Sequence, residues 1–433
     1  MTDAQTLAAT ARSLEGADSS RLSSAAEGFS GAAPAALVEA LGTLSPAHHS
    51  TGYLLLLDVL RQGLAQPSES YIAATCALLA GGVGSALRTM PDRLAAVCRA
   101  LKEGCIACGA PKRAIAPLQA AVRLAQPSES HLTPQHADLF QVCLASKCYA
   151  AASAVLANDV LVVSPEATGV TARDFLLWCY YGGMLCAGLR RYEQAMELLL
   201  SAVTAPAVAL NAIVVAAYKK YVLVSLVSAG AVPALPKFTS SVVQRHLKSC
   251  CAEYGELAAA YATRSPDELL KAVGAHHELL ARDVNLGLAK QVVRSLYTRN
   301  IQRLTQTYLT LSLEDIASAV GLAGAREAER HVLQMLEAGE IFATIDQRDG
   351  MVSFREDPER YDTRATSAAI VREIEQVTGL AGKVQAMDEE VQCDRGYVMK
   401  CLASGRPSLA TTAAAATAAA AGADPAAAGP AGV

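Results

Sequence analysis

The sequence predicts a mainly α-helical protein: an α-solenoid of helical repeats, then a winged-helix module, then a C-terminal helix. Between residues 52 and 231, apolar residues recur at helical spacing, and Pro or Gly marks the breaks. Between residues 309 and 358, two helical stretches precede two short stretches that alternate apolar and polar residues. After Pro358, an apolar residue returns every seven positions. The composition agrees, because 52% hydrophobic and only 5% aromatic residues suit thin, closely packed helices.

The clearest repeat unit lies at residues 174–203. A helical stretch with bulky residues ends at Gly188, which we expect to form the turn into a second helix. The second stretch spaces its apolar residues as one helix face: Tyr192, Ala195, Met196, Leu199 and Leu200. This pattern is typical of a tetratricopeptide-like helical hairpin. Such hairpins do not bury their apolar faces alone, so we expect them to stack into a solenoid.

The winged-helix module is predicted from a change of pattern after residue 309. Ser312 caps a short helix, a turn follows at residues 321–324, and a second helix covers residues 325–338. Residues 341–346 then alternate, a turn falls at residues 347–350, and residues 351–354 alternate back. A helix–turn–helix followed by a β-hairpin is a winged helix.

The last helix is predicted to carry a stripe of the coiled-coil type. Gly379 and Gly382 weaken this helix without removing the pattern. The stripe consists of Ile370, Ile374, Val377, Val384 and Val391. Residues 410–433 are mostly Ala, with Gly and Pro, and offer no large apolar side chain for a core, so we expect a disordered tail.

These patterns divide the chain into six predicted parts. They are an N-terminal helical or irregular segment (1–50), the helical-repeat solenoid (51–232), a helical part that leads into the module (233–308), the winged-helix module (309–358), the C-terminal helix (359–404) and the Ala-rich tail (405–433).

Charge and hydropathy argue against membrane and nucleic-acid partners. The net charge is −4, so no global basic field attracts nucleic acid or anionic lipid. The run from Leu198 to Tyr218 has no charge and is long enough to span a bilayer, but Pro206 interrupts it. We therefore expect two buried helices there and no membrane span.

The winged helix itself raises the question of DNA binding, since many such modules bind DNA. Residues 301–360 contain six basic and eleven acidic side chains, a difference of −5. Phosphate neutralisation supplies most non-specific affinity for DNA, so an acidic module is repelled. The expected partner of this module is therefore protein.

The sharpest metal candidate is Cys105 and Cys108 together with His131 and His136. Ligand types and pair spacings fit a zinc site. However, the 22 residues between the pairs exceed the usual spacing of about 12 in a small finger. Cysteines three apart in an Ala-rich helix are more simply core neighbours. We expect no metal and no cofactor here, with zinc as the alternative.

No catalytic residue is predicted either. A nucleophilic Cys needs a lowered pKa and a partner His, and nothing local suggests either for Cys179 or for the pair Cys250-Cys251. The twelve cysteines lie mostly among Ala and Leu, and the first twenty residues lack the apolar stretch of a secretory signal. We therefore expect reduced thiols and a place in the cytoplasm and nucleus.

Helical repeats that lead into a winged helix and a terminal helix resemble the PCI-domain proteins. Among these proteins, several short stretches of this sequence are similar to the COP9 signalosome subunit 3 family. The strings that carry the resemblance are Tyr180-Tyr181-Gly182-Gly183-Met184, Leu235-Pro236-Lys237-Phe238-Thr239-Ser240, Asn300-Ile301-Gln302-Arg303-Leu304-Thr305, Gly339-Glu340-Ile341-Phe342-Ala343 and Asp349-Gly350-Met351-Val352-Ser353-Phe354.

The resemblance implies a non-catalytic scaffold subunit of an eight-subunit complex that removes the ubiquitin-like protein NEDD8 from cullin-RING ubiquitin ligases. The zinc isopeptidase of that complex is a different subunit. The alternative is a PCI scaffold of the proteasome lid or of a translation-initiation complex, and a third class is an enzyme or nucleic-acid binder.

Members of the family are thought to join side by side through their winged helices and to gather their C-terminal helices in a bundle. This implies that other signalosome subunits contact the hairpin edge and the terminal stripe, with cullin-RING ligases as indirect partners. The predicted contact residues are Ile341, Ala343, Ile345, Met351, Ser353, Ile370, Ile374, Val377, Val384 and Val391.

Overall fold

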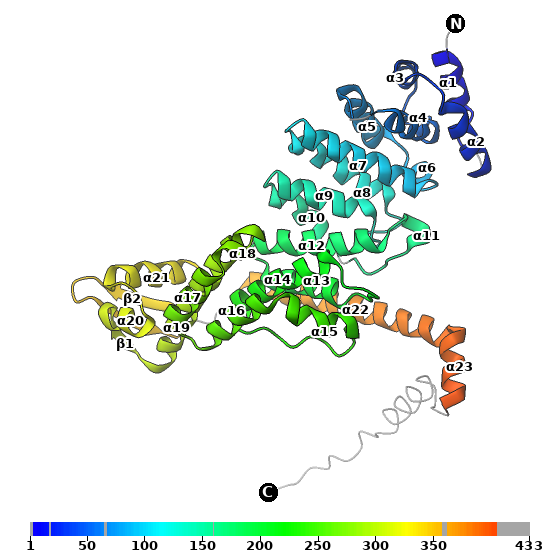
Figure 1. The fold of residues 1–433 in the computed structure, drawn as a ribbon. Helices are drawn as coiled ribbons and strands as arrows, with labels where there is room; N and C mark the ends of the chain where they lie inside the picture. Colours follow the sequence, from blue (N-terminus) through cyan, green and yellow to red (C-terminus); the bar gives the residue numbers. More distant parts are fainter. Residues whose placement is uncertain (1–2, 17–18, 65–66, 159, 357–361, 405–433) are drawn as a thin grey trace. The chain divides into compact units, whose positions relative to one another are not determined.

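The computed structural model describes residues 3–16, 19–64, 67–158, 160–356 and 362–404. The chain divides into two compact units, Met1–Arg355 and Glu356–Val433. The first unit holds the repeats and the winged helix, and the second holds the C-terminal helices (Figure 1). The predicted mainly helical architecture, with repeats that lead into a winged helix, is confirmed.

The repeats stack as successive layers of helices (Figure 1). One continuous apolar core runs from the first helices to α12 and includes the N-terminal segment that the sequence left as helical or irregular. The elements are α1 (Asp3–Arg12), α2 (Ser19–Phe29), α3 (Pro34–Thr43), α4 (Ser50–Gly63), α5 (Glu69–Gly81), α6 (Gly84–Leu87), α7 (Pro91–Ala107), η1 (Pro111–Ala114), α8 (Ile115–Ala125), α9 (Pro134–Ala145), η2 (Tyr149–Ala152), α10 (Ser153–Leu156), α11 (Pro165–Thr168), α12 (Ala172–Gly188), α13 (Tyr192–Thr204) and α14 (Ala212–Ser228).

The predicted hairpin at residues 174–203 forms as α12 and α13, but its turn differs from the prediction. Arg190, and not Gly188, takes the left-handed conformation, with φ +61°. The Arg191 N–H then donates to the Cys186 carbonyl (2.9 Å) and closes the end of α12. The glycine that the hairpin requires is Gly183, because a Cβ there would lie 2.6 Å from Cγ of Leu199 on α13.

Five further helices connect the repeats to the winged helix: α15 (Ser241–Cys250), α16 (Ala252–Ala262), α17 (Pro266–Ala275), α18 (His277–Arg282) and α19 (Leu286–Thr307). Helix α14 contributes to two apolar cores. Tyr221 and Val224 belong to the core with α12 and α13, whereas Leu223 and Leu226 belong to the core with α16 and α19. Helix α14 is therefore buried on both sides and joins the repeats to the helices that lead into the winged helix.

A polar network fastens α14 to the turn between α18 and α19. Lys219 Nζ donates to Asp283 Oδ2 (2.6 Å), and Lys220 Nζ donates to Asn285 Oδ1 (2.6 Å). Tyr254 of α16 closes the network: its hydroxyl donates to Asp283 (3.0 Å) and accepts from Asn285 Nδ2 (2.8 Å). Side-chain hydrogen bonds thus join α14, α16 and the turn between α18 and α19, which are distant in sequence.

The winged helix consists of α20 (Leu313–Val320), α21 (Ala325–Glu337) and a three-stranded antiparallel sheet of order β1-β3-β2. The strands are β1 (Thr310–Ser312), β2 (Phe342–Asp346) and β3 (Met351–Arg355). Ser312 caps α20 as predicted, since its Oγ accepts from the Asp315 N–H (3.0 Å). The sequence did not predict β1, because three residues before a helix cap carry no alternation.

In the described part of the second unit, residues 362–404 form two helices where the sequence predicts one: α22 (Arg364–Cys393) and α23 (Arg395–Ser404). Thr363 caps α22, with its Oγ1 accepting from the Thr366 N–H (3.2 Å). Asp394 separates the two helices because its backbone is extended, and its carboxylate accepts from the Tyr397 N–H (3.0 Å). The predicted tail at residues 405–433 lies outside the described residues.

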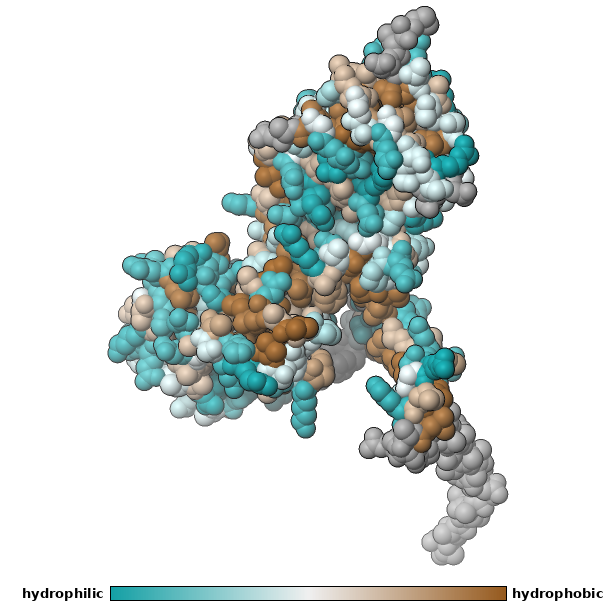
Figure 2. All heavy atoms as spheres, turned by 45° about the vertical axis from the view of Figure 1, so that its right-hand side comes forward, coloured by the Kyte–Doolittle hydropathy of each residue, from teal (hydrophilic) through white to brown (hydrophobic). Residues whose placement is uncertain are grey.

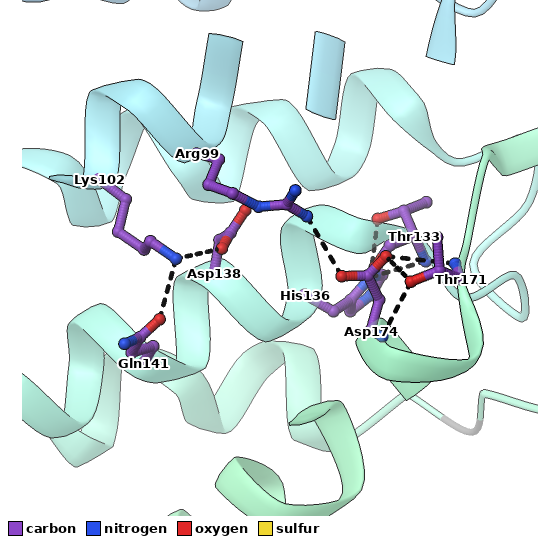
Figure 3. A network of polar contacts seen from close by, with 8 residues as sticks. All are labelled: Arg99, Lys102, Thr133, His136, Asp138, Gln141, Thr171 and Asp174. Atoms are coloured by element: carbon purple, nitrogen blue, oxygen red, sulfur yellow. Dashed lines mark hydrogen bonds and ion pairs between the residues drawn. The ribbon is translucent and has the colours of Figure 1, made fainter. Parts of the chain in front are cut away.

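A buried polar network links three layers of the repeats (Figure 3). Lys102 of α7 donates to Asp138 Oδ1 (2.7 Å) and to Gln141 Oε1 (2.9 Å), both on α9. Arg99, one turn earlier on α7, reaches Asp174 of α12 (3.2 Å). Burial raises the pKa of Asp138 above its ordinary value, and the Lys102 ammonium opposes that rise. The network therefore depends on Lys102, whose ammonium stabilises the buried Asp138 carboxylate.

His136 lies in the first turn of α9 and forms a capping box with Thr133, the residue that caps this helix. The Thr133 N–H donates to His136 Nδ1 (3.1 Å), and the Thr133 hydroxyl lies 2.8 Å from the same nitrogen. The side chain is buried. Burial lowers the pKa of His136 to about 4, and the Thr133 carbonyl, 3.2 Å from Nδ1, only partly opposes this shift. The imidazole is therefore neutral in the folded protein near pH 7.

We expect Lys102→Met to destabilise the repeats by about 3–5 kcal/mol, because it leaves Asp138 buried without its cation. The double variant Lys102→Met with Asp138→Leu removes both charges and should regain most of the loss. The matched control is Arg330→Met, which breaks the exposed Arg330–Glu327 pair and should cost less than about 1 kcal/mol. Urea denaturation monitored by circular dichroism measures all three variants. A double variant as unstable as the single one would contradict this account.

We also expect the stability of the protein to fall as the pH drops from about 6.5 to 4. His136 has a folded pKa of about 4, whereas an unfolded His titrates near 6.5, so protons favour the unfolded chain across this window. The contribution is roughly 3 kcal/mol over the whole window. His136→Asn should lower stability at pH 7 but reduce its fall with acid. An unchanged pH profile in this variant would show that another group is responsible.

Candidate assembly surfaces

The backbone of β2 leaves part of its hydrogen-bonding capacity free. The Phe354 N–H donates to the Leu309 carbonyl (2.8 Å), so the backbone groups of Phe354 face β1. Backbone groups alternate along a strand, so those of Ser353 face β2, where its partner is Thr344. By the same alternation, the N–H and C=O groups of Ala343 and Ile345 point away from β3. They form a free edge.

The predicted contact residues of the wing fall into three groups. Ala343 and Ile345 lie on β2, with half-buried side chains against the module's core and backbone groups at the free edge. Ile341 precedes β2 and is only 5% exposed, so its side chain belongs to the core. Met351 and Ser353 lie on β3, the central strand between β1 and β2. Their backbones do not form a free edge, so their contact with a partner stays a prediction that rests on side chains alone.

The C-terminal stripe is exposed along its whole length. The five predicted residues, Ile370, Ile374, Val377, Val384 and Val391, are between 50% and 64% exposed. Figure 2 shows apolar surface on the helices that precede the grey tail. Burying an exposed Val or Ile contributes about 1.5–3 kcal/mol. Covering this stripe would therefore contribute a large favourable free energy to association.

The sequence interpretation missed three members of this surface: Val371, Leu380 and Met387, which are also exposed. Leu380 and Met387 each follow a Val of the heptad by three residues, so the stripe is a full a/d seam from Val377 to Val391. Reading the positions three after each Val would have found them. Val371 and Ile374 widen the seam at its start, beyond the width that a single partner helix covers.

In the helix of the module that could enter a DNA groove, Arg330 is paired with an acidic neighbour and the other charged residues are mixed in sign. Arg330 of α21 lies 3.2 Å from Glu327, and Glu329 accepts from Gln347 (2.8 Å). Glu327 also accepts from the Ala323 N–H at the start of α21 (3.1 Å). The exposed surface of α21 is therefore polar with both signs of charge, apart from Leu333. No basic face suited to a phosphate backbone arises from these residues.

The four residues of the zinc alternative do not form one site. His136 Nδ1 is occupied by the cap of α9, and His131 Nδ1 lies 2.7 Å from the Ser128 hydroxyl. Cys105 is buried in the core, whereas Cys108 is exposed. Within the part of the chain that the structure describes, no cluster of three or more His, Cys, Asp or Glu side chains is suited to a metal ion.

Burial suppresses the reactivity of Cys179 and Cys251, two of the three cysteines considered as nucleophiles, whereas Cys250 is exposed. Burial raises the pKa of Cys179 far above its ordinary value and that of Cys251 to about 11. A thiol with a raised pKa is protonated near pH 7 and is a poor nucleophile.

Among the described residues, no helix is both long and apolar enough to cross a bilayer. The run at residues 198–218 divides between α13 and α14, as predicted from Pro206.

Comparisons with known proteins agree with this architecture in chain order. Residues 22–243 match a family model described as COP9 signalosome complex subunit 3, N-terminal helical repeats, and residues 270–356 match the PCI domain. The chain is 42% identical over 374 residues to COP9 signalosome complex subunit 3 of Arabidopsis thaliana, covering 85% of each chain. It is 35% identical over 368 residues to the protein of that name from Dictyostelium discoideum, covering 84% of this chain and 88% of the relative. The chain therefore belongs to the COP9 signalosome subunit 3 family.

Proposed function

We propose that this chain is a non-catalytic scaffold subunit of the COP9 signalosome, where it supports removal of NEDD8 from cullin-RING ubiquitin ligases. The observation that carries the proposal is the exposed apolar seam of α22, on a chain whose relatives are named as subunits of that complex. A seam of this kind is stable only when other helices cover it. The proposed partners are therefore the C-terminal helices of other subunits.

The scaffold role is supported by the charged residues between the helices, which form ion pairs within the fold. The buried charges pair with one another between layers of helices, as Lys102 does with Asp138 and Lys219 with Asp283. These groups serve the fold and face no solvent-accessible reaction site. The match of the repeats to subunit 3 favours the signalosome over the PCI scaffolds of the proteasome lid and of translation initiation. We place the protein in the cytoplasm and nucleus, where cysteine thiols stay reduced.

The second proposed contact is the free edge of β2. A neighbouring winged helix that adds a strand there would bond to the outward backbone groups of Ala343 and Ile345. Edge pairing fixes the direction and register of the partner, whereas the seam of α22 supplies buried apolar area. The two surfaces thus have different roles in one assembly.

We expect Ala343→Pro to weaken assembly while leaving the chain folded. Its N–H points to the free edge, so Pro removes a donor that only a partner uses. The matched control is Thr344→Pro, which removes a donor that faces β3 and should unfold the wing itself. Ser353→Pro should also unfold the wing, because Ser353 lies on the central strand. Co-elution with the other signalosome subunits and thermal melting separate the effects. Normal co-elution of Ala343→Pro would argue against edge pairing.

We expect Ile374→Asp with Val384→Asp to abolish assembly without changing the melting temperature of the free chain. Both side chains are exposed before assembly, so charge there costs free energy only when a partner buries it. The matched control is Ala368→Asp with Ala386→Asp, which adds the same charge outside the seam and should assemble normally. Removal of residues 405–433 should also leave assembly intact. The proposal fails if the seam variant joins the complex at the wild-type level.

A further inference from the structure

A second exposed apolar surface lies on two loops of the first unit, separate from the wing and from α22. Val208 lies on the loop between α13 and α14, and Phe238 lies on the loop between α14 and α15 (Figure 1). Val208 is 96% exposed and Phe238 is 77% exposed. A large aromatic side chain in solvent is costly, and aromatic residues of this kind are typical anchors of protein interfaces.

The two loops are held together, so Phe238 is fixed in place. Ser240 Oγ donates to the Ala207 carbonyl (2.9 Å), which joins the loops directly. The Thr239 N–H donates to the Pro236 carbonyl (3.1 Å), and Gln244 Nε2 of α15 donates to the Thr239 carbonyl (3.1 Å). A side chain presented on a fixed loop loses little conformational freedom on binding, which favours affinity.

The surroundings of this surface are basic. Residues 198–252 contain no Asp or Glu and five Lys or Arg. Lys219 and Lys220 are bonded within the fold, but Lys237, Arg245 and Lys248 are exposed. Arg245 and Lys248 lie three residues apart on α15, and hence on one face.

Acidic residues flank this segment along the chain, with Glu197 on α13 before it and Glu253 and Glu256 on α16 after it. Glu253 is only half-exposed at the start of α16. Glu256 accepts from His276 Nε2 (2.8 Å). Within residues 198–252, however, every exposed charged side chain is basic, and such a segment attracts carboxylates.

We propose that Val208, Phe238, Lys237, Arg245 and Lys248 form a docking surface for an acidic segment of a partner protein. Apolar side chains of that segment cover Phe238 and Val208, while its carboxylates lie against the cations. Protein is favoured over nucleic acid or a lipid surface. Three exposed cations provide few phosphate contacts, so nucleic acid or an anionic lipid surface gains little from the charge here. This surface goes beyond the proposed function, because neither β2 nor α22 takes part in it.

The test is selection of a random 12-residue peptide library on the purified full chain, which needs no other signalosome subunit. We expect the enriched peptides to be acidic and to carry aromatic or aliphatic side chains. A synthetic peptide from the selection should lose about tenfold or more in affinity with Phe238→Ala. It should lose a similar factor with Lys237→Glu combined with Arg245→Glu, and added salt should weaken binding to the wild type.

The matched controls are Leu270→Ala and Lys271→Glu, which change an exposed apolar and an exposed basic residue of α17. Both should bind the peptide as the wild type does. Enrichment of neutral or basic peptides, or equal binding by Phe238→Ala, would overturn the proposal. Binding of a 15-base-pair duplex or of phosphatidylserine vesicles, lost in Phe238→Ala and without any acidic peptide enriched, would overturn it in favour of the other partner class. Because no complex is assembled, a negative result leaves the scaffold proposal untouched.

Discussion

The turn between α18 and α19 decides where the winged helix stands on the repeats, and four side-chain bonds hold that turn. Asp283 and Asn285 bond to consecutive lysines of α14 and to Tyr254 of α16. Burial works against the Asp283 carboxylate, but the bonds from Lys219 and Tyr254 outweigh it, so the pKa of Asp283 lies below its ordinary value. Burial also lowers the pKa of Lys220. Helix α19 begins directly after this turn and ends at the first strand of the module.

The backbone of the same turn is strained. Val284, between the two anchored residues, has φ +56°, which a β-branched residue rarely adopts. Its side chain is 84% exposed, so no packing compensates for the conformation. The side-chain bonds on both sides therefore impose it. Such strain persists only where the surrounding structure fixes the chain strongly, and here it fixes the direction in which α19 leaves the repeats.

Local signals predicted much of the fold, and long-range contacts account for the rest. The hairpin of α12 and α13, the cap at Ser312 and the seam of α22 follow from spacings within about ten residues. The bonds from Lys219 to Asp283 span 64 residues, and those from Lys102 to Asp138 span 36. No spacing rule finds such pairs in one sequence. Strand β1 also depends on a long-range contact, because its three residues become a strand only through their pairing with β3.

The candidate surfaces also divide into one that a local sequence pattern predicts and others that only the structure reveals. The stripe of α22 could be predicted, because a heptad pattern states directly which side chains share a face. The free edge could not be placed, because the sequence does not say which strand is central. Ser353 illustrates this: its alternation identified a strand correctly, and the strand order then removed its backbone from the edge. Phe238 gave no local signal at all, since only the structure shows that an aromatic residue beside prolines is exposed.

The exposed seam of α22 has a consequence for the supply of this protein in the cell. A chain synthesised in excess of its partners displays an apolar strip more than twenty residues long, from Ile370 to Val391. Such a strip is a site for self-association and for chaperones and proteases that recognise unassembled chains. In the proposed assembly other helices cover this strip, which would couple the survival of each molecule to the number of available partners. The side chains proposed to join the complex would then also make an orphan copy short-lived, and subunit ratios would stay balanced without a separate sensor.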